Sequence, residues 1–411
     1  MKRILRYAAA FFLAVLSLHA WPREPRDRVM TGIEVLESRN PGFIKGRKIG
    51  IVTNKTTLDS RMRTTVEVLA AMKETRVAAI YSPEHGFTGG RTGDVEDQSD
   101  SLTGIRIFSL HGKTRRPTGE MLEGIDMLVF DMQDIGVRSY TYASTMKNCM
   151  EEAARRSIPF VVLDRPNPLG GLLVDGPVLD MGFSSFIGPG PVAYVHGMTM
   201  GELAGYFNTE LGINCKLTVV PMEGWKRWMR WQDTGLTWTP TSPNIPESDT
   251  PLFYATTGIL GELPLVSIGV GYTLPFKIFG APWIDPDRIS KKLNSMKLPG
   301  VFFQPFYFTP RYHHFKDTFC GGSRIIITDE KSFRPVETGY HVIGTLISMY
   351  PDNFDLSKIS GYAEGMFNQA NGTDLVLKMF REGKPAEEIV HGYQQGLESF
   401  MEQRKKYLLY E

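Results

Sequence analysis

The amino-acid sequence predicts an α/β fold: a Rossmann-like, doubly wound parallel sheet with a second, smaller α+β domain toward the C-terminus. The main observation is that short, unbroken apolar runs alternate with segments of helical periodicity in the N-terminal part of the chain. Strands of this kind are buried on both faces by the helices that connect them. The second observation is size, because 411 residues, 42% of them apolar and 22% charged, suffice for more than one soluble domain.

The N-terminal domain is expected to span residues 28–255. Its expected strands are residues 48–54, 76–82, 105–112, 127–134 and 159–164. Its expected helices are residues 29–39, 63–74, 140–157 and 201–207. Each strand is a short apolar run, and each helix repeats apolar residues every three to four positions.

The C-terminal domain is expected to span residues 256–411, where Gly-rich loops, short strands and helices are mixed. Its expected strands are 301–310 and 323–329, and its expected helices are 337–350 and 386–410. Just before it, Trp225, Trp228, Trp231 and Trp238 lie close together in the sequence. Sugar rings stack on aromatic side chains, but a Trp-rich stripe more often belongs to the hydrophobic core than to a ligand site.

Residues 1–20 are predicted to be a secretory signal peptide. Lys2, Arg3 and Arg6 precede an apolar stretch over residues 7–18, which is shorter than the ~20 residues of a membrane-spanning helix. We therefore expect a secreted protein, periplasmic or extracellular, without stable membrane insertion after cleavage. An uncleaved interfacial anchor is the alternative.

Charge and cysteine content exclude some classes of partner and cofactor. The formal net charge is +1, without a basic run, so no nucleic-acid partner is expected. Cys149, Cys215 and Cys320 are too widely spaced for a metal site or a disulfide framework, and we expect buried free thiols. The fingerprint of a dinucleotide site is missing after the first strand, as are the P-loop and nucleophile-elbow patterns, and no cofactor is expected.

Polar clusters follow three of the predicted strands. In a doubly wound sheet the ligand crevice lies outside the carboxyl ends of the strands, so these clusters are expected to meet in space. In the first, "SPEHGF", Glu84 stands between Pro83 and His85. A rigid, partly shielded carboxylic acid suits general acid catalysis. The alternative is a Glu–His pair that satisfies loop amides.

The other two clusters combine acids, amides, guanidinium groups and phenols, which suit a polyhydroxylated substrate. The first supplies Asp131, Gln133, Asp134, Arg138, Tyr140 and Tyr142, and the second supplies Asp164, Arg165 and Asn167. Arg138 paired with Asp131 or Asp134 in a structural salt bridge is the alternative. His85 is a candidate for binding substrate or orienting Glu84; the scattered histidines of the chain predict no metal site.

Six stretches occur in an order that resembles the NamZ-like exo-β-N-acetylmuramidases, from about residue 30 to the C-terminus. They are "SPEHGF", "FDMQDIGVRSYTY", "VLDRPNPLGG", "HGMTMGELA", "SPNIP" and "PFKIFGAPWID". The resemblance implies a glycoside hydrolase (EC 3.2.1.-) that releases N-acetylmuramic acid from the non-reducing end of peptidoglycan fragments, muropeptides or MurNAc-GlcNAc. It implies a cleft between the two domains, with Glu84 as the foremost acid. Gly86, His196 and Asn244 lie within these stretches and are further candidates for substrate binding.

The resemblance also points to Glu262 as a second carboxylate. The stretch that follows departs from the family pattern, with Leu263-Pro264-Leu265, Val270 and Tyr272 in place of smaller or polar residues. These departures keep open a relative with altered specificity or weakened activity, which could be a glycan-binding protein. A different cell-wall hydrolase, an amidase or esterase, is a further alternative. For the lactyl carboxylate of the substrate, the candidate cations are Arg138, Arg165 and Arg91.

Overall fold

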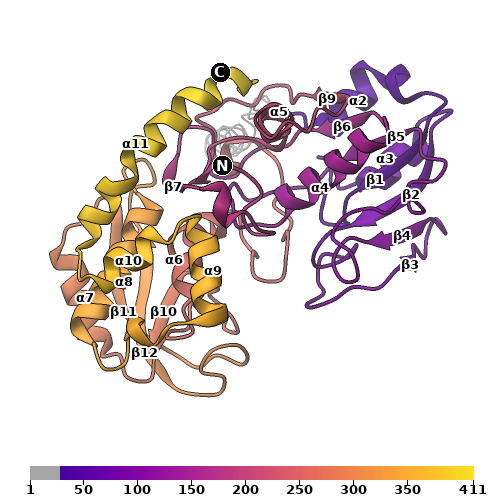
Figure 1. Cartoon of the computed structure of the whole chain (residues 1–411). Coiled ribbons are helices and arrows are strands. Elements are labelled where there is room, and N and C mark those ends of the chain that lie inside the picture. The colour runs from indigo at the N-terminus through magenta and orange to yellow at the C-terminus, as the bar shows by residue number, and fades with distance from the viewer. Residues whose placement is uncertain (1–27) are drawn as a thin grey trace, which may run out of the picture.

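The computed structural model describes residues 28–411, and the predicted signal peptide lies outside this range. Figure 1 shows two lobes, an N-terminal one built on a large sheet and a C-terminal one built on a small sheet under several helices. The described strands of the large sheet are β1 (Lys48–Val52), β2 (Arg76–Ser82), β3 (Gln98–Ser99), β4 (Arg106–Ser109), β5 (Met127–Phe130), β6 (Phe160–Leu163) and β9 (Leu217–Val220).

The strand order of the large sheet is β3-β4-β2-β1-β5-β6-β9. All neighbours pair in parallel except β3, which runs antiparallel to β4. Numbered along the chain without β3, the parallel strands follow the order 3-2-1-4-5-6 of a doubly wound dinucleotide-type sheet. The predicted fold class is therefore confirmed, and the topological switch point lies between β1 and β5.

Helices cover both faces of this sheet. On one face lie α2 (Gly32–Arg39), the 3₁₀ turn Pro41–Ile44 and α3 (Thr65–Ala71); on the other lie α4 (Tyr142–Arg155) and α5 (Met200–Glu210). The threonines Thr64 and Thr199 begin α3 and α5 with capping boxes, each accepting from the backbone N–H of a glutamate three residues on. These caps satisfy N–H groups that a helix start otherwise leaves unpaired.

The remainder of the chain forms the second lobe and its connections. The elements are β7 (Asp175–Val178), β8 (Ala193–Val195), α6 (Thr250–Gly261), β10 (Ile278–Ala281), α7 (Pro286–Ser295), β11 (Val301–Phe308), β12 (Cys320–Ile327), α8 (Pro335–Met349), α9 (Gly361–Asn371), α10 (Leu375–Arg381), α11 (Ala386–Arg404) and 3₁₀ turns at Met181–Phe183, Trp231–Asp233, Leu356–Lys358 and Lys405–Tyr407. Strands β10-β12-β11 form an antiparallel sheet, and β7 pairs with β8. The predicted boundary near residue 255 falls within α6 and stays a prediction.

The C-terminal segment returns to the N-terminal lobe, as the yellow helix α11 in Figure 1 shows. Tyr410 donates its hydroxyl to Asp164 Oδ2 at 2.6 Å, and the Leu409 N–H donates to Glu202 Oε1 at 2.8 Å. One hydrophobic core accordingly includes residues of both lobes. Trp225 and Trp231 are buried while Trp228 is exposed, so the Trp-rich stripe contributes mainly to the core.

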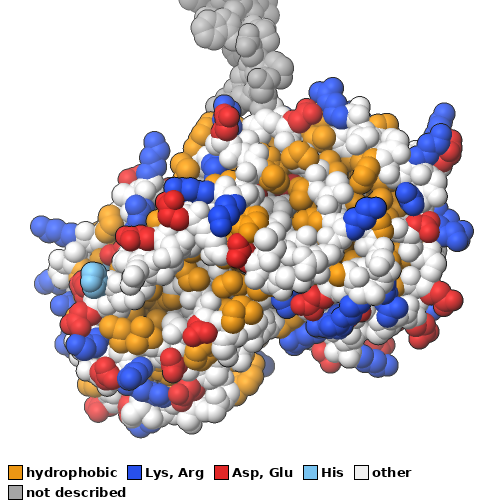
Figure 2. All heavy atoms as spheres, turned by 45° about the horizontal axis from the view of Figure 1, so that its top comes forward, with side chains coloured by type: hydrophobic (Ala, Val, Ile, Leu, Met, Phe, Trp, Pro, Cys, Tyr) orange, Lys and Arg blue, Asp and Glu red, His pale blue; other side chains and the backbone are white. Residues whose placement is uncertain are grey.

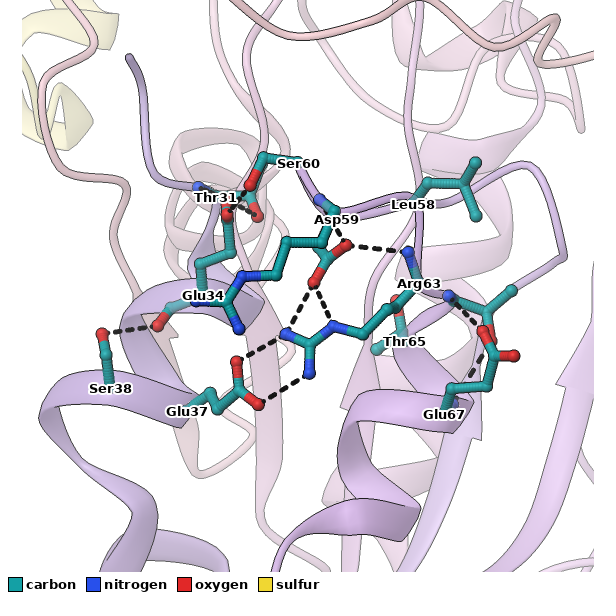
Figure 3. A network of polar contacts seen from close by, with 12 residues as sticks. Thr31, Glu34, Glu37, Ser38, Leu58, Asp59, Ser60, Arg63, Thr65 and Glu67 are labelled. Carbon is teal, nitrogen blue, oxygen red and sulfur yellow. Dashed lines mark hydrogen bonds and ion pairs between the residues drawn. The ribbon is translucent and has the colours of Figure 1, made fainter. Parts of the chain in front are cut away.

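The loop between β1 and α3 is held by the polar network of Figure 3. Arg63 donates from Nε to Asp59 Oδ2 at 2.8 Å and, with both terminal nitrogens, to the carboxylate of Glu37 on α2 at 2.9 and 2.7 Å. A bidentate guanidinium–carboxylate pair neutralises both charges and also fixes the relative orientation of the two side chains. The loop that borders the carboxyl edge of the sheet is thereby anchored to α2.

Acidic and basic side chains are interspersed on the face shown in Figure 2, in keeping with the near-zero net charge. Cys149, Cys215 and Cys320 are buried free thiols. Within residues 28–411, no helix combines the length and the apolar character needed to cross a bilayer.

Candidate functional site

A cavity of about 220 Å³ opens at the carboxyl edge of the large sheet. Its lining comes from the loops after β2 and β5, from the segment before α6, from α6 itself, and from the segments that precede β8 and β10. The lining residues are Glu84, His85, Ser139, Tyr140, Thr141, Ile187, Ser242, Asn244, Ile245, Tyr254 and Phe276. Glu84 is the single carboxylate among these lining residues of the described chain, and hydroxyl groups and aromatic rings make up most of the rest.

Glu84 is held by two side chains that arrive from other strands. Thr141, the residue that precedes α4, donates its hydroxyl to Glu84 Oε2 at 2.7 Å. His111, after β4, places Nε2 at 3.6 Å from Glu84 Oε1. The Glu84 side chain is 28% exposed, so it is shielded by the protein yet open to a ligand.

The backbone around the cavity is strained. His85 and Phe276 both have a positive φ, 69° and 65°, a conformation that is rare for residues with a side chain and that clusters at functional sites. His85 Nδ1 lies 2.9 Å from the carbonyl oxygen of Arg91, which can only accept, so Nδ1 carries the proton. Gly86 continues the turn with φ +70° and lies beside the cavity rather than lining it.

Two tyrosines of the predicted cluster support the cavity from below. The Tyr140 hydroxyl donates to Thr241 Oγ1 at 2.9 Å, and the Tyr142 hydroxyl donates to the Thr241 carbonyl oxygen at 2.9 Å while accepting from Asn54 Nδ2 at 3.1 Å. Tyr140 lines the cavity, whereas Tyr142 lies behind it.

Glu262 lies at the C-terminal end of α6 and does not line the cavity. Burial raises its pKa to about 7. Burial is the main cause of the raised pKa of Tyr194 and of Tyr254. The negative charge of nearby Glu262 also raises both pKa values. Tyr254 lines the cavity two turns earlier on the same helix, so Glu262 stands behind one wall of the site.

Asp131 and Arg165 pair with each other in the interior. Arg165 donates from Nε to Asp131 Oδ1 and from Nη2 to Oδ2, the latter at 3.1 Å. Thr65 adds a hydroxyl donor to Asp131 at 2.6 Å, and Arg165 Nη1 donates to the Leu58 carbonyl oxygen at 2.7 Å. With 0% and 3% side-chain exposure, this pair joins strand ends and the β1–α3 loop, away from the cavity.

Arg138 is likewise engaged in the interior. Its Nη1 donates to the carbonyl oxygens of Pro177 and Val192, both at 2.7 Å, and its Nη2 donates to that of Ala370 on α9 at 2.8 Å. Burial lowers its pKa to about 10. Arg138 therefore ties the loop after β5 to the second lobe.

Asp164 and His196 also have interior partners. Asp164 accepts from Thr199 Oγ1 at 2.7 Å and from the Gly201 N–H at 2.8 Å, which holds the start of α5. Burial raises the pKa of Asp164 to about 6. His196 accepts at Nδ1 from the Met198 N–H at 3.1 Å, and burial lowers its pKa to about 3. Both residues thus shape the turn that leads into α5.

Gln133, Asp134 and Asn167 form a second small interior group. Gln133 Nε2 donates to the carbonyl oxygens of Asp134 and Pro166 at 2.8 and 2.9 Å. Asn167 Nδ2 donates to the Met198 carbonyl oxygen at 3.0 Å. Of the predicted substrate-binding residues, His85, Tyr140 and Asn244 line the cavity with Glu84, while the others are adjacent to it or elsewhere in the core.

Three of the residues that depart from the family pattern, Leu263, Val270 and Tyr272, pack against apolar neighbours. Leu263 and Val270 are buried, and the ring of Tyr272 packs against Phe306 and Phe308 with centroid distances of 6.2 and 5.6 Å. None of these residues lines the cavity.

Several site residues were missed by the sequence analysis. Ser139, Thr141, Ser242, Tyr254, Phe276 and His111 reach the cavity or Glu84 only through the fold. Ser139 and Thr141 lie inside the stretch "DMQDIGVRSYTY", Ser242 belongs to "SPNIP" and Phe276 to "PFKIFGAPWID", so the position of these four residues in the stretches was the one available signal. Within residues 28–411, no group of three or more His, Cys, Asp or Glu side chains is arranged to hold a metal ion.

The interior position of Asp134 can be tested by the pH dependence of the protein's stability. Its Oδ1 accepts from the Gly136 N–H at 2.7 Å, Oδ2 has no partner in the described chain, and burial raises its pKa from 3.8 to about 7. Between these two pH values the folded state holds a proton that the unfolded state has lost, so stability falls as pH rises. Asp134→Asn should therefore match the wild type near pH 4 and exceed its melting temperature at pH 8.

Melting temperatures measured across this range by scanning calorimetry check the prediction. The exposed Asp352→Asn variant is the control and should follow the wild-type profile. Identical profiles for the wild type and Asp134→Asn would contradict the interior assignment.

Comparison with known proteins matches nearly the whole described chain. Residues 49–249 match the model of the N-terminal part of exo-β-N-acetylmuramidase NamZ, and residues 252–410 match that of its C-terminal part. The peptidoglycan β-N-acetylmuramidase NamZ of Bacillus subtilis (strain 168) is 40% identical over 387 residues, which cover 94% of this chain and 92% of that protein.

Two solved structures of DUF1343 family proteins from Bacteroides fragilis NCTC 9343 share the fold. The first has a TM-score of 0.89 and is 40% identical in sequence; the match covers 94% of this chain and 100% of the Bacteroides chain. The second has a TM-score of 0.75 and is 31% identical; the match covers 93% of this chain and 99% of the Bacteroides chain. Matched in both halves and over nearly its full described length, the chain belongs to the NamZ family of exo-β-N-acetylmuramidases.

Proposed function

We propose that this chain is an exo-acting glycoside hydrolase that releases N-acetylmuramic acid from the non-reducing end of peptidoglycan fragments, with Glu84 as general acid and base. The observation that carries the proposal is the cavity in which Glu84 is the single lining carboxylate among the described residues, surrounded by hydroxyl, amide and aromatic groups. The activity named for the Bacillus subtilis relative is the second support.

In the first step, protonated Glu84 gives its proton to the glycosidic oxygen as the bond to the anomeric carbon breaks and the 2-acetamido oxygen of the substrate bonds to that carbon, so the leaving group departs as an alcohol. In the second step, the Glu84 carboxylate takes a proton from the attacking water. The Thr141 hydroxyl, at 2.7 Å from Oε2, keeps the carboxyl group oriented through both steps.

The remaining lining groups suit a sugar. Ser139 Oγ lies within hydrogen-bond distance of the Tyr194 and Tyr254 hydroxyls, at 3.0 and 3.1 Å, so a chain of hydroxyl groups ends at the cavity wall. Asn244 offers an amide at the rim, where its Oδ1 accepts from the Tyr312 hydroxyl at 3.1 Å. Such short donors and acceptors bind sugar hydroxyls, while the rings of Tyr254 and Phe276 provide apolar contact.

Glu262 is the candidate for the second carboxylate. Its position behind Tyr254, with a pKa raised to about 7 by burial, suits an electrostatic role better than direct attack on the sugar. The 2-acetamido group of the substrate itself would then supply the nucleophile, as in substrate-assisted hydrolases.

The function is tested with purified protein and a chromogenic aryl β-N-acetylmuraminide, with release of free N-acetylmuramic acid from MurNAc-GlcNAc followed in parallel. Release from both substrates, unaffected by a chelator, supports the proposal. Calorimetric binding of muropeptides without turnover would identify a glycan-binding protein instead. Chelator-sensitive cleavage of an amide or ester bond would identify the other class of cell-wall hydrolase.

We also propose secretion to the periplasm or cell exterior, on the basis of the sequence of residues 1–20. Mass spectrometry of the mature N-terminus after cell fractionation tests this proposal. An intact N-terminus in the cytoplasmic fraction would contradict it.

A further inference from the structure

One face of helix α4 holds three groups in a row. Thr141, just before the helix, donates its hydroxyl to Glu84 at 2.7 Å; Ser144 donates its hydroxyl to the Phe186 carbonyl oxygen at 2.6 Å. One turn further, Asn148 Nδ2 donates to the carbonyl oxygen of Arg115 at 2.8 Å. Residues three and four positions apart share a helix face. The same face of α4 therefore holds Glu84, Phe186 and Arg115 by one hydrogen bond each.

The length of this row follows from helix geometry. With a rise of 1.5 Å per residue, Asn148 stands about 10 Å along the axis from Thr141. The row is also continuous through side chains. The His111 ring, whose Nε2 is 3.6 Å from Glu84 Oε1, lies 6.1 Å from the Phe186 ring, and the Arg115 guanidinium lies 4.3 Å from the same ring. The residue after Phe186, Ile187, lines the cavity.

Arg115 combines an aromatic stacking partner with a guanidinium that pairs with no carboxylate in the described chain. Its side chain is exposed. The next residue, Arg116, pairs instead with Glu151 at 3.2 Å and Glu152 at 3.3 Å. A guanidinium stacked on an aromatic face keeps its N–H edge free for a bidentate acceptor.

We propose that Arg115, stacked on Phe186, binds a carboxylate of the substrate and thereby selects muramoyl over glucosaminyl sugars. The inference rests on the proposed function and identifies a specificity-determining residue for it. N-acetylmuramic acid differs from N-acetylglucosamine by a lactyl ether that ends in a carboxylate. Where a peptide stem is attached, that carboxyl group is an amide and the nearest carboxylate belongs to the stem, so both sources present the same chemistry.

The earlier candidates for this role fit less well. Arg138 and Arg165 donate to buried acceptors and have no free edge toward the cavity. Arg91 is exposed on the loop after Glu84, and its variant is included in the test as the competing cation.

The test compares three aryl β-muraminides: one with the free lactyl carboxylate, its uncharged methylamide, and one with a stem dipeptide that bears carboxylates. Arg115→Gln should lower kcat/KM by about tenfold or more on a substrate whose carboxylate it binds, mainly through KM, and should leave the methylamide unchanged. A loss confined to the free acid identifies the lactyl group, and a loss confined to the dipeptide identifies the stem. Arg115→Lys should recover part of the loss, because it restores the charge without the planar fork.

Arg106→Gln is the matched control. Arg106 is also exposed and stacked on a phenylalanine, with its guanidinium 4.6 Å from the Phe108 ring, but it stands at the start of β4, at the opposite edge of the sheet from Glu84. This variant should behave as wild type on all three substrates. Equal effects of Arg115→Gln on all three substrates, or a charge-dependent loss in Arg91→Gln alone, would overturn the proposal.

A binding measurement separates this inference from the proposed activity. If the wild type releases no sugar from any substrate, the proposed function fails, and calorimetry with free N-acetylmuramic acid and N-acetylglucosamine then decides on Arg115. Preference of the wild type for the acid sugar, lost in Arg115→Gln, supports the subsite. Equal affinity of the wild type for both sugars overturns it.

Discussion

Glu84→Gln should lower the rate of N-acetylmuramic acid release by at least ~100-fold, because a positioned general acid contributes roughly 10²–10⁴-fold. Glutamine keeps the size of the side chain and can still accept from Thr141, whose hydroxyl lies 2.7 Å from Glu84 Oε2, but it has no proton to give. The measurement is kcat on a series of aryl glycosides whose leaving groups differ in acidity. The loss should shrink for the most acidic leaving groups, which depart without protonation.

Glu96→Gln provides the control for this variant. Glu96 is an exposed glutamate on the loop that precedes β3, outside the lining of the cavity, and its substitution should leave kcat unchanged. A rate for Glu84→Gln close to that of wild type would remove Glu84 from the acid role. A large loss that is the same for every leaving group would make its role electrostatic or nucleophilic.

Glu262→Gln, measured alongside, assigns the second carboxylate. If Glu262 acts through the wall of the cavity, its loss should cost about tenfold, less than the loss of Glu84. A loss as large as that of Glu84→Gln would place Glu262 in direct contact with the reacting sugar. A wild-type rate would leave the second role to the acetamido group of the substrate.

The strands and the position of Glu84 were predictable because they depend on local pattern. The apolar run of residues 77–81 is too short for a core helix and follows a predicted helix, which favours a buried strand, and the strand that contains it ends at Ser82, two residues before Glu84. The ends of parallel strands meet at one edge, so an acid just after such a strand has to lie near the crevice. Little more than periodicity is needed to place it.

The partners of Glu84 could not be predicted, because they depend on contacts between distant segments. Thr141 and His111 reach the carboxylate from positions 57 and 27 residues away in the chain, and neither residue type is distinctive. Conversely, Arg138 and Arg165 have the charge of substrate-binding residues. Only the packed structure shows that the guanidinium groups of these two arginines donate to acceptors in the interior. An unpaired charge there would be costly.

Arg165→Met should lower the free energy of unfolding by about 3–5 kcal/mol, the typical cost of leaving a buried charge without its partner. Asp131 has 0% side-chain exposure, and in this variant its carboxylate keeps the Thr65 hydroxyl, at 2.6 Å, as its donor. Denaturant unfolding followed by tryptophan fluorescence measures the loss. Activity of the remaining folded protein should show a near-normal KM, since Arg165 does not line the cavity.

The double variant Asp131→Asn/Arg165→Met separates a structural ion pair from a substrate contact. Removing both charges abolishes the uncompensated carboxylate, so the double variant should be more stable than Arg165→Met alone, although Leu58 still loses the donor that lies 2.7 Å from its carbonyl oxygen. Additive losses would show that the two side chains act independently. A fully stable Arg165→Met with a raised KM would instead return Arg165 to the substrate, because a cation that stabilises only the complex leaves the unliganded fold unchanged.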